Sequence, residues 1–234
     1  MRIVAIESAT AAASVALGED RRVLASARRV DRRGHVPFLV PALDLLFEQV
    51  GWSPSDVDVV AVDVGPGLFG GIRTGLATAQ ALAGAVGAHL VPASSVDAVA
   101  LRAATGHRKI WSVVDVRRGE VAVAPYQPVP GGVVREGPVE LVDPDGFRAI
   151  LTSDRRDLLV VGDWESLPEG FFRGLHGVRA GRPRYPSADA LVELAYARVM
   201  KGEFPHPDEV RPRYMRDPDV RINWTDYRRE EPWR

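Results

Sequence analysis

The chain has 234 residues, of which 46% are hydrophobic and 26% are charged, and these proportions are ordinary for a globular protein. Its formal net charge of -1 lacks the basic excess of a free nucleic-acid-binding protein, and the absence of cysteine excludes disulfides, thiolate catalysis and cysteine zinc sites. We find no signal peptide and no apolar run long enough to span a bilayer, so we expect a cytoplasmic protein without membrane contact.

The chain is predicted to open with a meander of three strands, at Ile3–Ile6, 14–17 and 23–27. A basic loop separates the meander from the first helix, in which Pro41 is expected to cause a kink or a delayed start. One face of this helix carries apolar residues at helical spacing, namely Leu39, Leu43, Leu46 and Val50.

The stretch from Val57 to Ala85 changes its period abruptly. Val57–Val64 is a valine-rich run typical of a strand buried on both faces, and Gly65-Pro66-Gly67 ends it. Small and apolar residues then recur at helical spacing. A glycine-rich turn before a helix can hold a phosphate, but neither the P-loop spacing nor the dinucleotide-binding glycine pattern is present.

We therefore interpret this stretch as a sharp turn followed by a helix with a stripe of small residues. A glycine inside a helix costs about 1 kcal/mol relative to alanine, so the stripe favours close approach of another helix. That helix can belong to the same chain or to a different one, and the pattern alone slightly favours the same chain. The stripe and its flank comprise Gly71, Gly75, Leu76, Ala79, Leu82 and Ala83.

Beyond a strand at His89–Ala93 and a helix expected to begin with a capping box at Ser94, the opening pattern returns. Ile110–Asp115 is again an apolar strand that ends in an acid, and a turn leads to a second strand. This repetition indicates an internal duplication with a cleft between two α/β domains. The predicted domains are 1–106 and 107–216, followed by a tail at 217–234.

The rest of the second half is predicted to be richer in turns. Residues 128–132 are expected to form a loop. Further strands are predicted at 139–142, 158–161 and 178–180, and helices at 143–150 and 188–200.

Paired hairpins with an acid at each mouth are typical of the actin, sugar-kinase and Hsp70 superfamily, which holds ATP phosphates and magnesium between two domains. The predicted fold is therefore α/β, with two tandem actin-like (ribonuclease H-like) domains. Such hairpins need glycines in both turns so that backbone amides can reach the phosphates. The first turn, with Glu7 and Thr10, has no glycine, and the second places Arg117 and Arg118 after Asp115. We interpret both as degenerate phosphate hairpins, with no catalytic residue, metal site or bound cofactor in this chain.

Several segments together resemble the TsaB family of tRNA threonylcarbamoyladenosine biosynthesis proteins. Glu7 stands where that family usually has aspartate, and Leu68 and Gly70 replace its usual serine and threonine. Leu39 stands one helical turn after His35, where the catalytic paralogue TsaD has its second metal-binding histidine. The segments that carry the resemblance are 6–10, His35, 65–79, 115–121 and 212–216.

The resemblance implies a non-catalytic scaffold subunit that dimerises with TsaD, the enzyme that transfers threonylcarbamoyl to the adenosine beside the tRNA anticodon. It also implies that the ATPase TsaE joins the assembly, that ATP and metal belong to these partners, and that tRNA is contacted only through the complex. The family's dimer is a helical bundle, which maps here onto the apolar face of the first helix and the small-residue stripe of the second.

Two alternatives stay open. One is an active ATPase or kinase of the same fold that uses Glu7 and Asp115. The other is a homodimer formed through the same two helices when the chain is alone. If the stripe binds the partner, replacing Ala79 with arginine should abolish binding and leave the fold intact.

Overall fold

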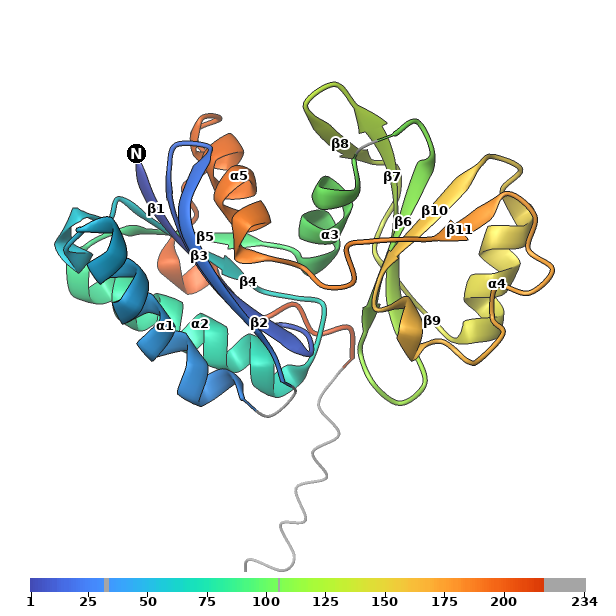
Figure 1. Ribbon diagram of the computed structural model, residues 1–234, viewed down its shortest axis with the longest axis horizontal. Coiled ribbons are helices and arrows are strands. Elements are labelled where there is room, and N and C mark those ends of the chain that lie inside the picture. The colour runs from blue at the N-terminus through green and yellow to red at the C-terminus, as the bar shows by residue number, and fades with distance from the viewer. Residues whose placement is uncertain (32–33, 105, 217–234) are drawn as a thin grey trace, which may run out of the picture.

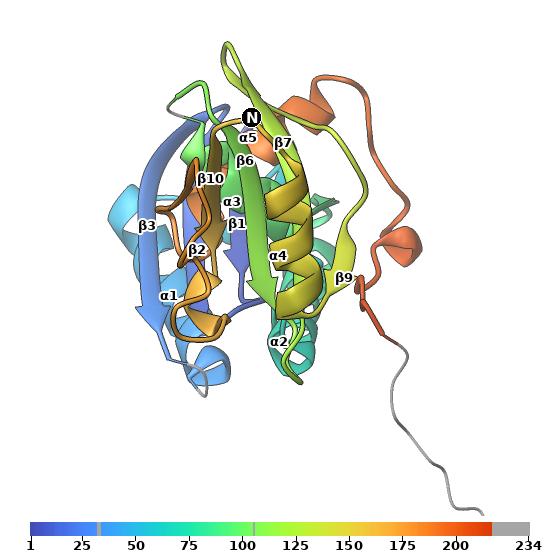
Figure 2. The ribbon, with the colours of Figure 1, turned by 90° about the vertical axis from the view of Figure 1, so that its right-hand side faces the viewer.

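The computed structural model describes residues 1–31, 34–104 and 106–216 (Figure 1). The predicted tail, 217–234, lies outside the described residues. Two β-sheets stand side by side, each with helices on its faces (Figures 1 and 2). A mixed α/β architecture with two sheets is therefore observed, as the sequence predicts.

The first sheet has the strand order β3-β2-β1-β4-β5. The first three strands form an antiparallel meander, whereas β4 and β5 run parallel to β1. Its strands are β1 (Arg2–Glu7), β2 (Ala12–Glu19), β3 (Arg22–Val30), β4 (Val59–Asp63) and β5 (His89–Ala93). The short helix η1 (Pro54–Asp56) precedes β4.

Helices cover both faces of the first sheet. On one face, α1 (His35–Val50) and α2 (Phe69–Val86) pack against alternate residues of β1, β2 and β4, such as Val4 and Val62. On the other face, α5 (Ala188–Val199) packs against the intervening residues, such as Ile3 and Ala61. Because both faces are buried, β1 and β4 are apolar without alternation.

The second sheet has the order β11-β10-β6-β7-β8, with β9 paired to β7. β7 is antiparallel to β6, and β10 and β11 are parallel to it, so this sheet repeats the topology of the first. That repetition supports an internal duplication. The strands are β6 (Lys109–Asp115), β7 (Val121–Val129), β8 (Gly132–Arg135), β9 (Glu140–Val142), β10 (Leu158–Gly162) and β11 (Val178–Ala180).

Two helices flank the second sheet. α4 (Pro144–Ser153) buries Phe147 and Leu151 on one face, and α3 (Ser95–Ala103) buries Val96 and Val99 on the other. α3 also contributes Ala98 to the core beneath α5, so α3 joins the two halves of the molecule. The remaining short helices are η2 (Trp164–Ser166) and η3 (Pro207–Glu209).

The predicted domain division at residue 107 needs correction. α5 lies at 188–199, yet its buried residues pack on the first sheet, and Val210 belongs to the core beneath α1 and α2. The chain therefore returns to its first half after β11. The sequence pattern finds α5 but carries no information about which sheet its apolar face covers.

Three local predictions also differ from the structure. α1 begins at His35 and continues through Pro41. Pro41 has no amide hydrogen to donate to the carbonyl of Pro37, but both prolines lie on the exposed side of the helix, where that carbonyl can bond water instead. Ser94 makes no capping bond and instead donates its hydroxyl to the Gly65 carbonyl at 3.0 Å. The predicted loop at 128–132 is shorter in the structure, where only 130–131 form a turn between the end of β7 and the start of β8.

Candidate functional site

The turn of the first hairpin, residues 8–11, is buried. The Glu7 carboxylate accepts hydrogen bonds from the Ala9 amide at 2.9 Å and from Ser14 Oγ at 3.4 Å. On the side of α2, Ser8 Oγ donates to the Gly71 carbonyl at 2.8 Å, and the Leu68 amide donates to the Ala9 carbonyl at 2.6 Å. The turn is thus closed by contacts within its own chain rather than open to a phosphate.

The glycines before and within α2 make room for this turn. A Cβ atom at position 67 would lie 2.0 Å from the Ala9 carbonyl oxygen, and one at position 71 would lie 2.0 Å from the Ser8 carbonyl oxygen. At Gly75 a Cβ atom would lie 2.4 Å from Ser8 Oγ. The small-residue stripe therefore receives mainly the chain's own first hairpin. The predicted close approach of another helix is limited to His35, the first residue of α1, whose Nδ1 would lie 3.2 Å from a Cβ atom at Gly71.

The ten residues predicted to contact a partner face inward. Eight of them are buried: Leu39, Leu43, Leu46, Gly71, Gly75, Leu76, Ala79 and Ala83. Val50 and Leu82 are half-buried and pack against the same core. Ala79 has no exposed surface, so arginine at this position would disrupt the core rather than spare the fold.

The opposite sides of α1 and α2 are exposed. On α1, Val36 is 70%, Val40 61% and Leu45 51% exposed, and on α2 Phe69 is 46% exposed. The outward side of α2 also carries small residues at helical spacing, namely Gly70, Ala77, Ala81 and Gly84. Val36 and Val40 lie on the same flank of α1, whereas Leu45, nine residues after Val36, lies on the other flank. We call the seven residues other than Leu45 the outer face. The helices lie side by side on one face of the first sheet (Figure 1). In the sequence, the outer face could have been found from the second set of apolar and small residues in each of these two helices.

The C-terminal segment 210–216 borders the outer face at the start of α2. The Tyr214 ring stacks on Phe69 with 4.9 Å between centroids, and Arg73 Nε donates to the Tyr214 hydroxyl at 2.9 Å. The Arg73 guanidinium lies 3.7 Å from the centre of the Phe69 ring. Further along, Arg216 forms an ion pair with Glu120 beside the second hairpin turn. The segment thus connects the outer face with the second half of the molecule.

The second hairpin turn is more exposed than the first. Asp115 is half-buried and accepts a hydrogen bond from the Arg117 amide at 2.8 Å. Arg117, Arg118 and Gly119 all have positive φ, and both arginine side chains are exposed beside a cavity of about 260 Å³. Of the residues predicted for degenerate phosphate hairpins, Glu7 and Thr10 are therefore buried, whereas Arg117 and Arg118 face solvent.

Sequence reasoning missed a second buried carboxyl group, Asp63, at the end of β4. Its Oδ1 accepts from the Gly65 amide and from Ser95 Oγ, both at 2.8 Å, while its buried Oδ2 has no hydrogen-bond partner. Burial raises the pKa of Asp63 to about 7, and burial together with the charge of Asp63 raises the pKa of Glu7. Asp63 could have been found from the sequence as an acid within an otherwise apolar strand.

We predict that Asp63→Asn flattens the pH dependence of stability. A carboxyl whose folded pKa is raised from 3.8 to about 7 is most stabilising when protonated, so wild-type stability should fall as pH rises between these values. The loss attributable to Asp63 is up to about 4 kcal/mol. Urea unfolding at pH 5 and pH 8 measures it, with exposed Asp44→Asn as control. An unchanged slope in Asp63→Asn would contradict the assignment.

Comparison with known proteins extends over nearly the whole chain. The family model of TsaD, the tRNA N6-adenosine threonylcarbamoyltransferase, matches residues 25–133. The chain is 29% identical to the TsaB protein of Escherichia coli over 93% of this chain and 95% of that protein. It is 28% identical to TsaB of Bacillus subtilis over 75% and 73% of the two chains. These similarities support assignment of the chain to the TsaB family.

Solved structures agree with this assignment. A protein from Pseudomonas aeruginosa with similarity to peptidase YeaZ superposes with a TM-score of 0.77 at 27% identity, covering 92% of this chain and 99% of that one. The activator of 2-hydroxyisocaproyl-CoA dehydratase from Clostridium difficile, solved with ADPNP, has a TM-score of 0.50 at 12% identity over 88% and 99% of the two chains, which bears on the fold alone. The predicted fold class, with two actin-like domains, is confirmed.

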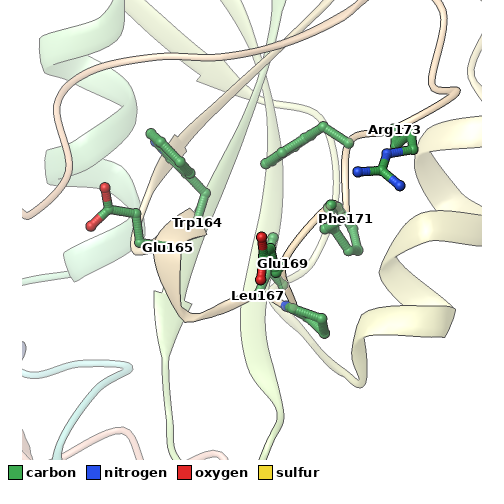
Figure 3. Close-up of a pocket in the computed structure, with 9 residues that line it drawn as sticks. Trp164, Glu165, Leu167, Glu169, Phe171 and Arg173 are labelled. Atoms are coloured by element: carbon green, nitrogen blue, oxygen red, sulfur yellow. The ribbon is translucent and has the colours of Figure 1, made fainter.

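A pocket of about 470 Å³ lies in the second half of the chain, where η2 leads into the following loop (Figure 3). Trp164 and Phe171 contribute rings to its lining, and Glu165, Glu169 and Arg173 contribute charged groups. Trp164 Nε1 donates to the Gly181 carbonyl at 2.8 Å, which fixes one wall. None of the residues predicted for a site lines this pocket.

His35 lies buried at the start of α1, and burial lowers its pKa. Leu39 is one turn further along the helix, so these two positions offer a single imidazole. In residues 1–31, 34–104 and 106–216, no three histidine, aspartate or glutamate side chains are grouped to hold a metal ion.

In the described part of the chain, no helix has the length and apolar character needed to cross a membrane.

Proposed function

We propose that this chain is the non-catalytic subunit of a tRNA threonylcarbamoyladenosine-forming complex and that it binds a TsaD-like catalytic subunit through the outer face of α1 and α2. A TsaE-like ATPase then joins the complex, and tRNA is reached only through it. ATP and metal are supplied by these partners, and this chain requires neither. The similarity to TsaB proteins supports a role for this chain in threonylcarbamoyladenosine biosynthesis.

The observation that carries the proposal is the exposure of three large apolar side chains, Val36, Val40 and Phe69, on two adjacent helices. Val36 and Val40 lie one turn apart on α1, and Phe69 begins α2. Single exposed apolar residues are common, but a group on neighbouring helices is typical of an interaction surface. The small residues Ala77 and Ala81 leave the middle of α2 flat, so a helix of a partner can approach it closely.

The alternative is an ATPase that uses Glu7 and Asp115. The buried first turn argues against it, because the Ala9 amide already bonds Glu7 and the Ala9 carbonyl already bonds the Leu68 amide. An anion-binding hairpin instead needs free amides directed at the ligand. The raised pKa of Glu7 also disfavours the charged carboxylate that a magnesium site requires.

Sedimentation velocity and a phosphate-release assay test the proposal together. We expect a heterodimer when the chain is mixed with a TsaD-like subunit, and no steady ATP hydrolysis by the chain alone with magnesium. Sedimentation of the chain alone shows whether the outer face also forms a homodimer that the partner displaces. Steady phosphate release that disappears in Asp115→Ala, without heterodimer formation, would support the ATPase instead.

A further inference from the structure

A third cavity, of about 440 Å³, is lined mainly by arginine side chains. Its lining contains four guanidinium groups, one tyrosine ring and no carboxylate. The lining residues are Arg28, Arg102, Arg182, Pro183, Arg184 and Tyr185. Such a concentration is unexpected in a chain whose net charge is -1.

The cavity is built from segments far apart in the sequence. Arg28 comes from β3 and Arg102 from the last turn of α3, whereas residues 182–185 lie in the connection from β11 to α5, which crosses between the two sheets (Figure 1). The Gly162 amide donates to the Pro183 carbonyl at 2.8 Å and so ties this connection to the second sheet. The arginines are therefore held by both halves of the molecule.

Two of the four arginines are neutralised from outside the cavity. Arg102 forms an ion pair with Glu193 at 2.7 Å, and Arg184 forms one with Glu165. Arg28 instead lies over the Tyr185 ring at 5.5 Å, and its charge also acts on the buried Glu7 carboxyl without forming an ion pair. Within the described part of the chain, Arg182 pairs with no carboxylate. The cavity thus has a surplus of positive charge that no group of its own lining balances.

We propose that this cavity binds a compact oligophosphate, either free or as the phosphate groups of a nucleotide. Guanidinium groups pair with phosphate oxygens through two parallel hydrogen bonds, and the pairing is strongest when several donors converge. The cavity volume falls in the range of small-ligand sites, and its arginines converge from three segments rather than forming a row along the surface. This arrangement favours a compact anion over an extended phosphodiester chain. The inference does not depend on the proposed partner.

Isothermal titration of the full chain with inorganic triphosphate and with ATP, at low salt and without divalent cations, tests the proposal. We expect both to bind, and Arg182→Glu to weaken binding by about tenfold or more, which corresponds to about 1.4 kcal/mol. Arg179→Glu is the matched control, because Arg179 is exposed on β11, changes the net charge equally and lies outside the cavity lining. The affinity of Arg179→Glu for both ligands should stay within about twofold of the wild-type value, since an exposed charge outside the site contributes little to binding.

Comparison of the two ligands identifies the source of the phosphate. Equal affinities show that the phosphate groups suffice, whereas tighter binding of ATP shows that the nucleoside adds contacts. Arg28→Gln, which removes a guanidinium from the other wall, should also weaken both ligands. The proposal is overturned if neither ligand binds, if Arg182→Glu and Arg179→Glu lose affinity equally, or if Arg182→Glu binds both ligands as tightly as the wild type.

Discussion

Gly71→Ala is expected to destabilise the folded chain by about 3 kcal/mol, although alanine is the better helix former by about 1 kcal/mol. The new Cβ atom would stand 2.0 Å from the Ser8 carbonyl oxygen. Backbone atoms of a buried turn cannot yield as the end of a flexible side chain can. Either the first hairpin or the start of α2 must shift, and the bond from Ser8 Oγ to the Gly71 carbonyl is then lost.

Gly84→Ala is the matched control for this prediction. Gly84 lies in the same helix, but a Cβ atom there meets no other atom within 4 Å. Alanine at this position should stabilise the chain by about 0.5–1 kcal/mol, as helix propensity alone dictates. Chemical denaturation of the three proteins measures the difference. Equal stability of Gly71→Ala and Gly84→Ala would show that the hairpin does not press on α2.

Ala77→Arg is expected to abolish binding of a TsaD-like subunit, with a loss of affinity of about 100-fold or more. Ala77 is exposed in the middle of α2 and points away from the core that contains Ala79. A long charged side chain there would prevent close approach of a partner helix and would be costly to bury without a counter-charge. The free chain should stay folded, because arginine is a good helix former at an exposed position.

Ala180→Arg provides the control for partner binding. Ala180 is exposed on β11 in the other sheet, so the same chemical change is made far from the outer face. We expect the affinity of this variant, measured by titration with the TsaD-like subunit, to equal that of the wild type. If Ala77→Arg binds as tightly as Ala180→Arg, the outer face is not the interface.

The sequence predicts most elements of the fold because both faces of the central strands are buried. Runs such as Val57–Val64 and Ile110–Asp115 are apolar without alternation, and their spacing locates the helices between them. The β7–β8 hairpin was missed because Pro128 and the following glycines are typical of a loop. The structure accommodates Pro128 in the terminal part of β7, where it pairs only with Val133 of the outermost strand β8.

The candidate site was harder to predict than the fold. A stripe with Gly71 and Gly75 predicts close approach, and close approach is observed, but the periodicity does not say what approaches. The structure shows a hairpin turn of the same chain, which begins at Ser8. The cavity around Arg182 was also out of reach, because its residues come together only through the crossing of the connection between β11 and α5.

The most direct measurement of the central claim uses the absence of cysteine from the chain. A single Ala77→Cys substitution creates one thiol on the outer face, and Ala180→Cys creates one on the other sheet. The rate of maleimide modification of each is measured by mass spectrometry with and without the TsaD-like subunit. The proposed interface predicts at least about tenfold protection at position 77 and none at position 180. Equally fast modification of position 77 in the assembled complex would contradict it.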